Sequence, residues 1–234
     1  MNDNIENLII PTGIDFLDDA LGGGLSKNSL NLIGSHSGVG KTLFSMTICK
    51  NIYLQKNNVL HISYDENHSF IFNKYFEGGI KQNNYYSLDI VNIHDYNLDE
   101  IINIINNSNI NYDFVFIDVP FLSNNNDQKL FFNKLLKSNK TILLTTQLVN
   151  NNTSYYKVKN IELLYVVNTF ITLESINKKY GLLNLNIVKS RYYKPNTIKN
   201  VVLEYENLNI KKVNIFELII IKIKHYIYQF KFEE

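Results

Sequence analysis

The stretch that most limits what this chain can fold into is SHSGVGKT, residues 35–42. The apolar run LNLI precedes it, and apolar side chains at helical spacing follow Lys41. A glycine-rich turn between a strand and a helix, ending in Lys-Thr, is the pattern of a phosphate-binding loop. The backbone amides of such a turn and the positive end of the helix dipole attract anions. The sequence therefore predicts a strand–loop–helix unit that binds a nucleotide within an α/β fold.

The chemistry of the loop depends on a few side chains. Gly38 and Gly40 can adopt backbone conformations closed to other residues, so the backbone can approach a ligand. Lys41 places a positive charge at the outer phosphates, and the hydroxyl of Thr42 is a candidate ligand of Mg²⁺. ATP and Mg²⁺ are the cofactors we expect.

The loop departs from the strict pattern at one position, where Ser35 replaces the usual first glycine. We expect the preceding Gly34 to supply the same conformational freedom for the turn out of the strand. The residues expected to contact the nucleotide are Gly34, Ser35, Ser37, Gly38, Val39, Gly40, Lys41, Thr42 and Leu43.

Apolar runs alternate with helical patterns through the first two thirds of the chain, which predicts a mostly parallel sheet flanked by helices. From Val166 on, consecutive short apolar runs predict an antiparallel extension of that sheet. The last segment, residues 216–232, fits both a helix face and a strand, so both interpretations stay open. The expected strands are residues 29–34, 59–63, 88–93, 114–119 and 141–146, and the expected helices are residues 41–55, 67–76, 98–105 and 128–137.

Polar residues lie at or just after the ends of three of the predicted strands. Asp118 ends an apolar run, where a carboxylate can hold a water of the Mg²⁺ shell together with Thr42. Asp65 and Glu66 end the second strand and are candidate general bases that orient the attacking water, or simple caps of the following helix. Gln147 ends a later strand, where a neutral polar group can sense the γ-phosphate, although a plain turn residue would fit too.

Near the C-terminus, Lys189 and Arg191 are two residues apart on a predicted strand and therefore lie on one face. They are either a solvated surface or cations that reach a phosphate bound by the next subunit, where they would stabilise transferring charge.

Composition narrows the class of protein. The net charge is +1, so no global basic field indicates nucleic acid. The single cysteine, Cys49, cannot form an internal disulfide, which favours a reducing compartment. The acidic, polar start MNDNIENLII does not suit a signal peptide, and no apolar run reaches the roughly 18 residues of a membrane helix. We expect a cytoplasmic protein without a membrane partner.

Taken in order, these motifs resemble those of the RecA-like ring ATPases. The chain is similar in particular to the ATPase domain of the DnaB family of replicative helicases, including those of large tailed phages, over roughly residues 9–213. The motifs that carry the resemblance are PTGIDFLDDALGGGL, GSHSGVGKT, ISYDE, FVFIDVP, LLTTQL and IVKSRYYKP.

The resemblance implies a RecA-like P-loop NTPase core, with a mostly parallel twisted sheet flanked by helices and a C-terminal antiparallel extension. It implies a homohexameric ring that hydrolyses ATP at subunit interfaces and moves on single-stranded DNA in replication, in the host cytoplasm if a phage encodes it. A primase or a helicase loader would be a further partner. We expect residues 1–213 to form the RecA-like ATPase or helicase domain and residues 214–234 an apolar C-terminal extension.

The resemblance also implies roles for single residues. The family has a water-activating glutamate at the position of Asp65, so either the shorter Asp65 or Glu66 does this work. Gln147 matches a γ-phosphate sensor, and Lys189 and Arg191 match cations that reach the neighbour's γ-phosphate.

The loop from Val149 to Asn160 matches the DNA-facing loop of the family. It carries two tyrosines for stacking on bases and two lysines for phosphate contacts, with a plain surface loop as the alternative. These candidate DNA-binding residues are Tyr155, Tyr156, Lys157 and Lys159.

Two other functions stay open on sequence alone. A RadA-like or KaiC-like ATPase shares the entry motif and the strand-end acids, and acts in recombination or signalling. A nucleotide-gated DNA-binding or assembly factor with little turnover would account for Asp65 and for the modest positive charge. DNA-stimulated ATP hydrolysis and strand displacement separate the three.

Overall fold

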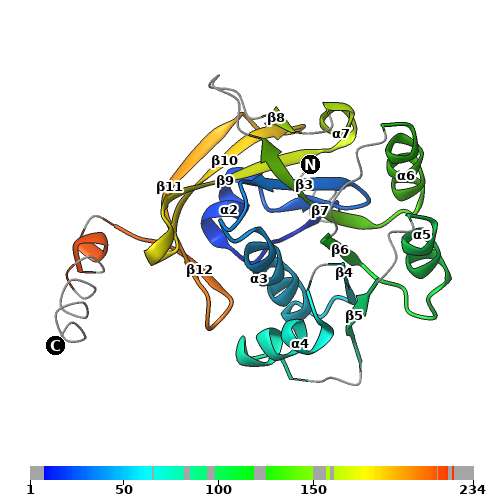
Figure 1. Cartoon of the computed structure of the whole chain (residues 1–234), viewed down its shortest axis with the longest axis horizontal. Coiled ribbons are helices and arrows are strands. Elements are labelled where there is room, and N and C mark those ends of the chain that lie inside the picture. The colour runs from blue at the N-terminus through cyan, green and yellow to red at the C-terminus, as the bar shows by residue number, and fades with distance from the viewer. Residues whose placement is uncertain are drawn as a thin grey trace.

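The computed structural model describes most of the 234-residue chain. The described residues are 8–64, 66–81, 85–93, 98–118, 125–149, 157–158, 161–214, 216–220 and 223. They form one ten-stranded sheet with helices on both faces (Figure 1). In spatial order its main path is β5 (Leu88–Asn92), β4 (Val59–Ser63), β6 (Phe114–Asp118), β7 (Thr141–Val149), β3 (Leu30–Ser35), β9 (Thr169–Asn177), β10 (Leu182–Ser190), β11 (Asn196–Glu204) and β12 (Asn209–Lys212).

The sheet has a parallel part and an antiparallel part that meet at β9. From β5 to β9 neighbouring strands run parallel, while β9, β10, β11 and β12 pair antiparallel. A tenth strand, β8 (Lys157–Val158), returns antiparallel onto the end of β7. The predicted fold class, a RecA-like core with an antiparallel C-terminal extension, is confirmed.

Two hydrophobic clusters lie on the two faces of the sheet because side chains alternate along each strand. In β3, Ile33 packs in the cluster under α2, α3 and α4, and Leu32 packs in the cluster under α5, α6 and α7. The helices are α2 (Asp15–Leu21), α3 (Lys41–Leu54), α4 (His68–Glu77), α5 (Leu98–Asn107), α6 (Asn125–Lys137) and α7 (Ile161–Val166). Among the described residues, no helix is long and apolar enough to cross a membrane.

The predicted elements recur with shifts of up to three residues, and the shift in β7 has a clear cause. This strand runs on to Val149, three residues past its predicted end, because Gln147 pairs with Ser35 of β3 and Leu148 pairs with Val158 of β8. These partners are distant in sequence, so the local pattern could not reveal them. Part of the loop expected from Val149 onward is therefore strand.

The glycine-rich entry segment packs against the loop between β10 and β11. Strands β1 (Ile9–Ile10) and β2 (Leu25–Ser26) form a small separate ribbon around α2. Gly22 ends α2 in the left-handed conformation, and a Cβ there would lie 1.6 Å from the ring of Tyr193. The Tyr193 hydroxyl donates to the Gly22 carbonyl at 3.4 Å. Gly22 thus fixes the loop that follows Arg191.

The last described residues are helical rather than extended. Asn214 and Glu217 form a capping box, in which each side chain accepts from the other's backbone N–H, at 2.9 and 2.8 Å. Residues 216–220 follow as helix, which decides the ambiguity for this part of the segment.

Among the described residues one histidine is buried in the core, His61 in β4, between α4 and the sheet. Its Nδ1 atom lies 3.0 Å from the Tyr75 hydroxyl, and its ring centroid lies 4.5 Å from that of Phe116. Burial lowers the pKa of His61 from 6.5 to about 3. The imidazole is therefore neutral in the folded protein at neutral and mildly acidic pH.

We expect His61 to destabilise the fold in acid. Below pH 6.5 the unfolded chain takes up a proton that the folded chain refuses, so the free energy of unfolding falls as the pH drops from 6.5 towards 3. The slope is at most about 1.4 kcal/mol per pH unit. His61→Phe should flatten it in denaturant titrations, whereas His68→Gln, at an exposed site on α4, should leave it unchanged. An unchanged slope in His61→Phe would contradict this assignment.

Candidate functional site

The predicted phosphate loop joins β3 to α3 with its amides open to a ligand. Gly38 and Gly40 have φ of 72° and 105°, in the left-handed region that favours glycine. Gly40 is the N-cap of α3, and no side chain caps this helix end or places an acid in its first turn. The first N–H groups of α3 are therefore available to an anion, which the helix dipole attracts.

The reason given for Gly34 from sequence is wrong. Gly34 lies inside β3 with an ordinary strand backbone, and so does Ser35, the last residue of that strand. A Cβ on Gly34 would lie 2.9 Å from Phe170 and 3.0 Å from Leu148, so close packing is what requires glycine here. Because position 35 needs no unusual φ, serine fits it without strain.

Ser35 instead contacts the loop lysine. The Lys41 ammonium donates to the Ser35 hydroxyl at 3.4 Å, and that hydroxyl donates to the His36 carbonyl at 2.8 Å. Burial lowers the pKa of Lys41, and the nearby charge of Asp118 raises it in part. A partly desolvated ammonium beside open backbone amides suits the outer phosphates of a nucleotide.

Asp118 joins the loop to two neighbouring strands. Its carboxylate accepts from the Thr42 hydroxyl at 2.6 Å and from the Thr145 hydroxyl of β7 at 2.5 Å. Hydroxyl and carboxylate oxygens are the hard donors that Mg²⁺ prefers, so Thr42 and Asp118 fit such an ion. Among the described residues no group of three or more His, Cys, Asp or Glu side chains could hold a metal ion, so most of the ion's ligands would come from phosphates and water.

Of the predicted acid pair, the structure describes Glu66, while Asp65 lies outside the described residues. The Glu66 N–H donates to the Ser63 hydroxyl at 3.3 Å, and its carbonyl accepts from the Asn92 side chain. The cap of α4 is Asn67, which accepts from Ser69, so Glu66 does not have the capping role. Glu66 instead lines the cavity beside the loop.

Gln147 lies beside the loop, in the strand next to β3. Its Cα pairs with that of Ser35, and it shares a strand face with Thr145, the partner of Asp118. The next residue, Leu148, has its carbonyl 3.2 Å from Nδ1 of His36, so the imidazole donates there. A hydrogen bond thus joins the phosphate loop directly to the end of β7.

An open cavity of about 770 Å³ adjoins the loop. Its other wall comes from the antiparallel extension, through Lys178, Tyr180, Leu203 and Tyr205. The Lys178 ammonium lies 3.9 Å from the place a Cβ on Gly38 would take. The cavity is large enough for a nucleoside whose phosphates would lie at the loop.

Lys189 and Arg191 lie near the end of β10, on the side of the sheet where β3 begins rather than where the phosphate loop follows it. The Arg191 N–H donates to the Asn168 carbonyl at 3.1 Å, and the Asn168 N–H donates to the Leu30 carbonyl at 2.7 Å. Arg191 is therefore level with the start of β3, whereas the phosphate loop follows its end, roughly 16 Å farther along the strand. Arg191 is exposed, and the Lys189 ammonium donates to the Leu164 carbonyl at 2.6 Å.

The candidate DNA contacts Tyr155, Tyr156 and Lys159 lie outside the described residues, and of Lys157 only the backbone is described, in β8. Two other residues were missed by sequence reasoning. Thr145 could have been found, because it lies two residues before Gln147 and so on the same face. Lys178 carried no local signal, since only the fold of the extension brings it to the loop.

The strand order, the phosphate loop and the bonded pair of Thr42 and Asp118 together define a RecA-like P-loop ATPase fold. The family model described as "ATPase: KaiC" matches residues 10–119. Among solved structures, the ATPase domain of G40P is similar, with a TM-score of 0.70 and 14% sequence identity over 91% of this chain and 95% of that chain. No curated protein matches the sequence. Because 598 solved chains match this structure, the fold does not choose among the functions it supports.

Proposed function

We propose that this protein is an ATP-dependent DNA helicase or translocase motor of DnaB type. In this proposal a homohexameric ring hydrolyses ATP with Mg²⁺ at its subunit interfaces and moves on single-stranded DNA in replication. The observation that carries the proposal is a site divided between two ends of the strands. The phosphate loop and Asp118 lie where the parallel strands end, and the exposed Arg191 lies where β3 begins. The order of motifs resembling the DnaB family supports the choice among RecA-like ATPases.

Each residue has a distinct part in the proposed reaction. Lys41 and the amides of the loop bind the phosphates and keep them oriented for in-line attack. A Mg²⁺ ion held by Thr42 and Asp118 would neutralise charge on the phosphate oxygens. Glu66, in the cavity wall, or its neighbour Asp65 would accept the proton of the attacking water.

The proposed ring follows from what the cavity contains. The described cavity walls carry two lysines, Lys41 and Lys178, and no arginine. Arg191 of one subunit can meet the phosphates of the next if copies pack edge to edge, where it would stabilise the charge that develops during transfer. Lys189, bonded to the Leu164 carbonyl, would hold the backbone next to Arg191 in place.

The proposed link to DNA runs through β7. Gln147 would sense the γ-phosphate, and the bond from His36 to the Leu148 carbonyl ties the loop to the strand end that leads into residues 150–160. Tyr155, Tyr156, Lys157 and Lys159 remain the candidate DNA contacts. A primase or a helicase loader remains a candidate further partner.

The proposal is tested by measuring ATP hydrolysis with and without single-stranded DNA, on protein whose oligomeric state is determined in the same buffer. We expect hydrolysis that DNA stimulates and that displaces an annealed strand. Stimulation without displacement would indicate a recombination-type ATPase. Nucleotide binding with negligible turnover, with or without DNA, would indicate an assembly factor.

Removing the Thr145 hydroxyl should slow hydrolysis without preventing nucleotide binding. Thr145→Val keeps the shape of the side chain but leaves the Asp118 carboxylate with one fewer charge-assisted hydrogen bond. Such a bond is worth about 1.5–3 kcal/mol, so we expect about a tenfold or greater fall in turnover. The Mg²⁺ concentration for half-maximal activity should rise as well.

Thr146→Val is the matched control, because Thr146 points to the opposite face of β7. It should retain wild-type turnover and Mg²⁺ dependence. If both variants behave alike, or if Thr145→Val has an unchanged Mg²⁺ dependence, Thr145 does not position Asp118.

A further inference from the structure

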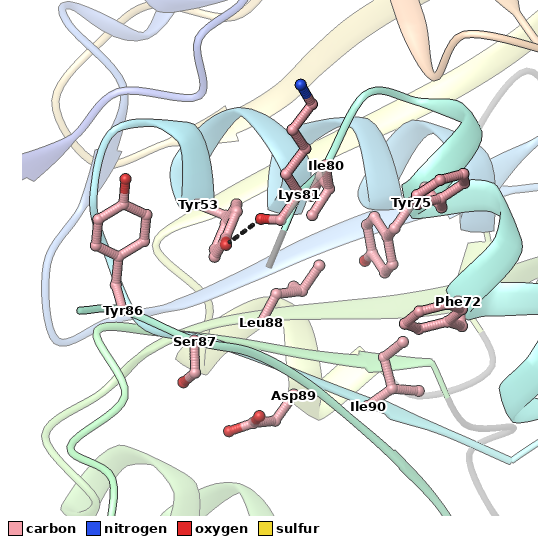
Figure 2. Close-up of a pocket in the computed structure, with 11 residues that line it drawn as sticks. Tyr53, Phe72, Tyr75, Ile80, Lys81, Tyr86, Ser87, Leu88, Asp89 and Ile90 are labelled. Carbon is pink, nitrogen blue, oxygen red and sulfur yellow. Dashed lines mark hydrogen bonds between the residues drawn. The ribbon is translucent and has the colours of Figure 1, made fainter. Parts of the chain in front are cut away.

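A second cavity, of about 570 Å³, lies between α4 and the edge strand β5, and it shares no lining residue with the cavity at the phosphate loop. In Figure 2, Tyr75, Phe72, Leu88 and Ile90 converge on this space, whereas Ser87 and Asp89 point to the other side. The side chains of Phe72 and Phe76, one helical turn apart on α4, are 45% and 67% exposed. The aromatic residues that line the cavity are Tyr53, Phe72, Tyr75, Phe76 and Tyr86.

The C-terminal helix presents a matching apolar surface. Leu218 packs against the small cluster of Leu182, Val202 and Val213, which attaches the helix to the body. The other apolar side chains of its described part point outward and are 47–78% exposed. They are Phe216, Ile219, Ile220 and Ile223. The sequence then continues with Tyr226, Ile227, Tyr228, Phe230 and Phe232.

The two apolar surfaces lie at opposite ends of the strand order. The cavity is at β5, the first strand of the main path, and the helix follows β12, the last. The turn between β11 and β12 does reach α4, where Leu208 packs against Gly78. From there β12 runs back away from α4, and residues 216–220 project from the body on the far side (Figure 1).

We propose that the C-terminal segment, residues 216–234, binds in the α4–β5 cavity of a second copy of this chain. This deepens the self-association that the proposed function requires. A contact between two different surfaces of identical chains is head-to-tail, so it repeats from copy to copy and builds a ring or a filament. An amphipathic helix in an apolar groove is a common mode of such recognition.

Chemical cross-linking between engineered cysteines tests the contact directly. The only native cysteine, Cys49, is fully buried, so introduced surface thiols are the ones that react. Protein carrying Ile220→Cys is mixed with protein carrying Phe76→Cys and treated with a short bis-maleimide. We expect a covalent dimer in about tenfold or greater yield over the control mixture, because docked thiols have effective concentrations near the mM range.

The control mixture pairs Ile220→Cys with Tyr165→Cys, which adds a thiol on α7 at a side chain 77% exposed. A second pair, Ile223→Cys with Phe72→Cys, guards against an unfavourable geometry in the first. The proposal is overturned if neither pair exceeds the control, or if Ile220→Cys alone forms the main dimer. It is also overturned if the double variant Ile220→Cys/Phe76→Cys cross-links only within one chain.

The outcome is separable from the proposed function, because cross-linking is done without nucleotide. Active ATPase with no cross-link would refute the docking of the C-terminal segment and leave the motor proposal standing. A specific cross-link in a protein that does not hydrolyse ATP would refute the motor proposal and leave the docking standing.

Discussion

Lys41→Ala should abolish ATP hydrolysis and weaken nucleotide binding. The Lys41 ammonium is the charge held over the loop, between the Ser35 hydroxyl and Asp118. Its burial makes each interaction with a phosphate stronger than in water. Removing one such preorganised group typically lowers turnover by about 10²–10³-fold. Steady-state hydrolysis and titration with a fluorescent ATP analogue would measure the two effects.

Lys137→Ala, at an exposed site on α6, removes the same charge away from the loop and should leave both quantities unchanged. Wild-type turnover in Lys41→Ala would overturn the nucleotide site and with it the whole functional proposal.

Arg191→Ala should leave ATP binding intact and lower turnover by about 10³-fold, as for arginines supplied across an interface. Binding is spared because Arg191 is level with Leu30, at the far edge of the sheet from its own phosphate loop. Hydrolysis and nucleotide titration, at protein concentrations where the oligomer is present, would separate the two effects. Lys194→Ala, an exposed lysine three residues along the same loop, is the matched control.

A mixing experiment decides whether Arg191 acts on its own subunit or on the next. Arg191→Ala protein keeps an intact loop, and Lys41→Ala protein keeps an intact arginine. If the arginine acts across the interface, mixing the two inactive proteins restores part of the activity, because some interfaces then combine the two intact halves. If activity stays absent in the mixture although mixed oligomers form, the cross-subunit role is wrong.

Much of the fold could be predicted because its signals are local. Three of the five residues in Val59–Ser63 are apolar and all five are buried, and this strand was placed without error, as a strand buried on both faces should be. The end of β7 was misplaced because pairing with β3 and β8, and not its own residues, continues it to Val149. A local sequence pattern cannot predict the end of a strand when pairing with a segment distant in sequence determines the conformation there.

Some residues of the candidate site could likewise be predicted from local signals, and others could not. Lys41, Thr42 and Asp118 were found because phosphate and Mg²⁺ chemistry requires those residue types next to a turn or a strand end. Thr145 was missed, although its position two residues before Gln147 places both side chains on the same face of the strand. Gly34 was found for the wrong reason, since its role is to leave room for Phe170.

A phosphate-binding loop in an α/β sheet could be predicted from the residues alone, because glycines, a lysine and a threonine at fixed spacing act over one turn of backbone. Which groups share the site could be learned only from the folded structure. Strand order brings Thr145 and Lys178 to the loop and carries Arg191 to the opposite edge. Those placements depend on pairings between strands far apart in the chain, which no short pattern encodes.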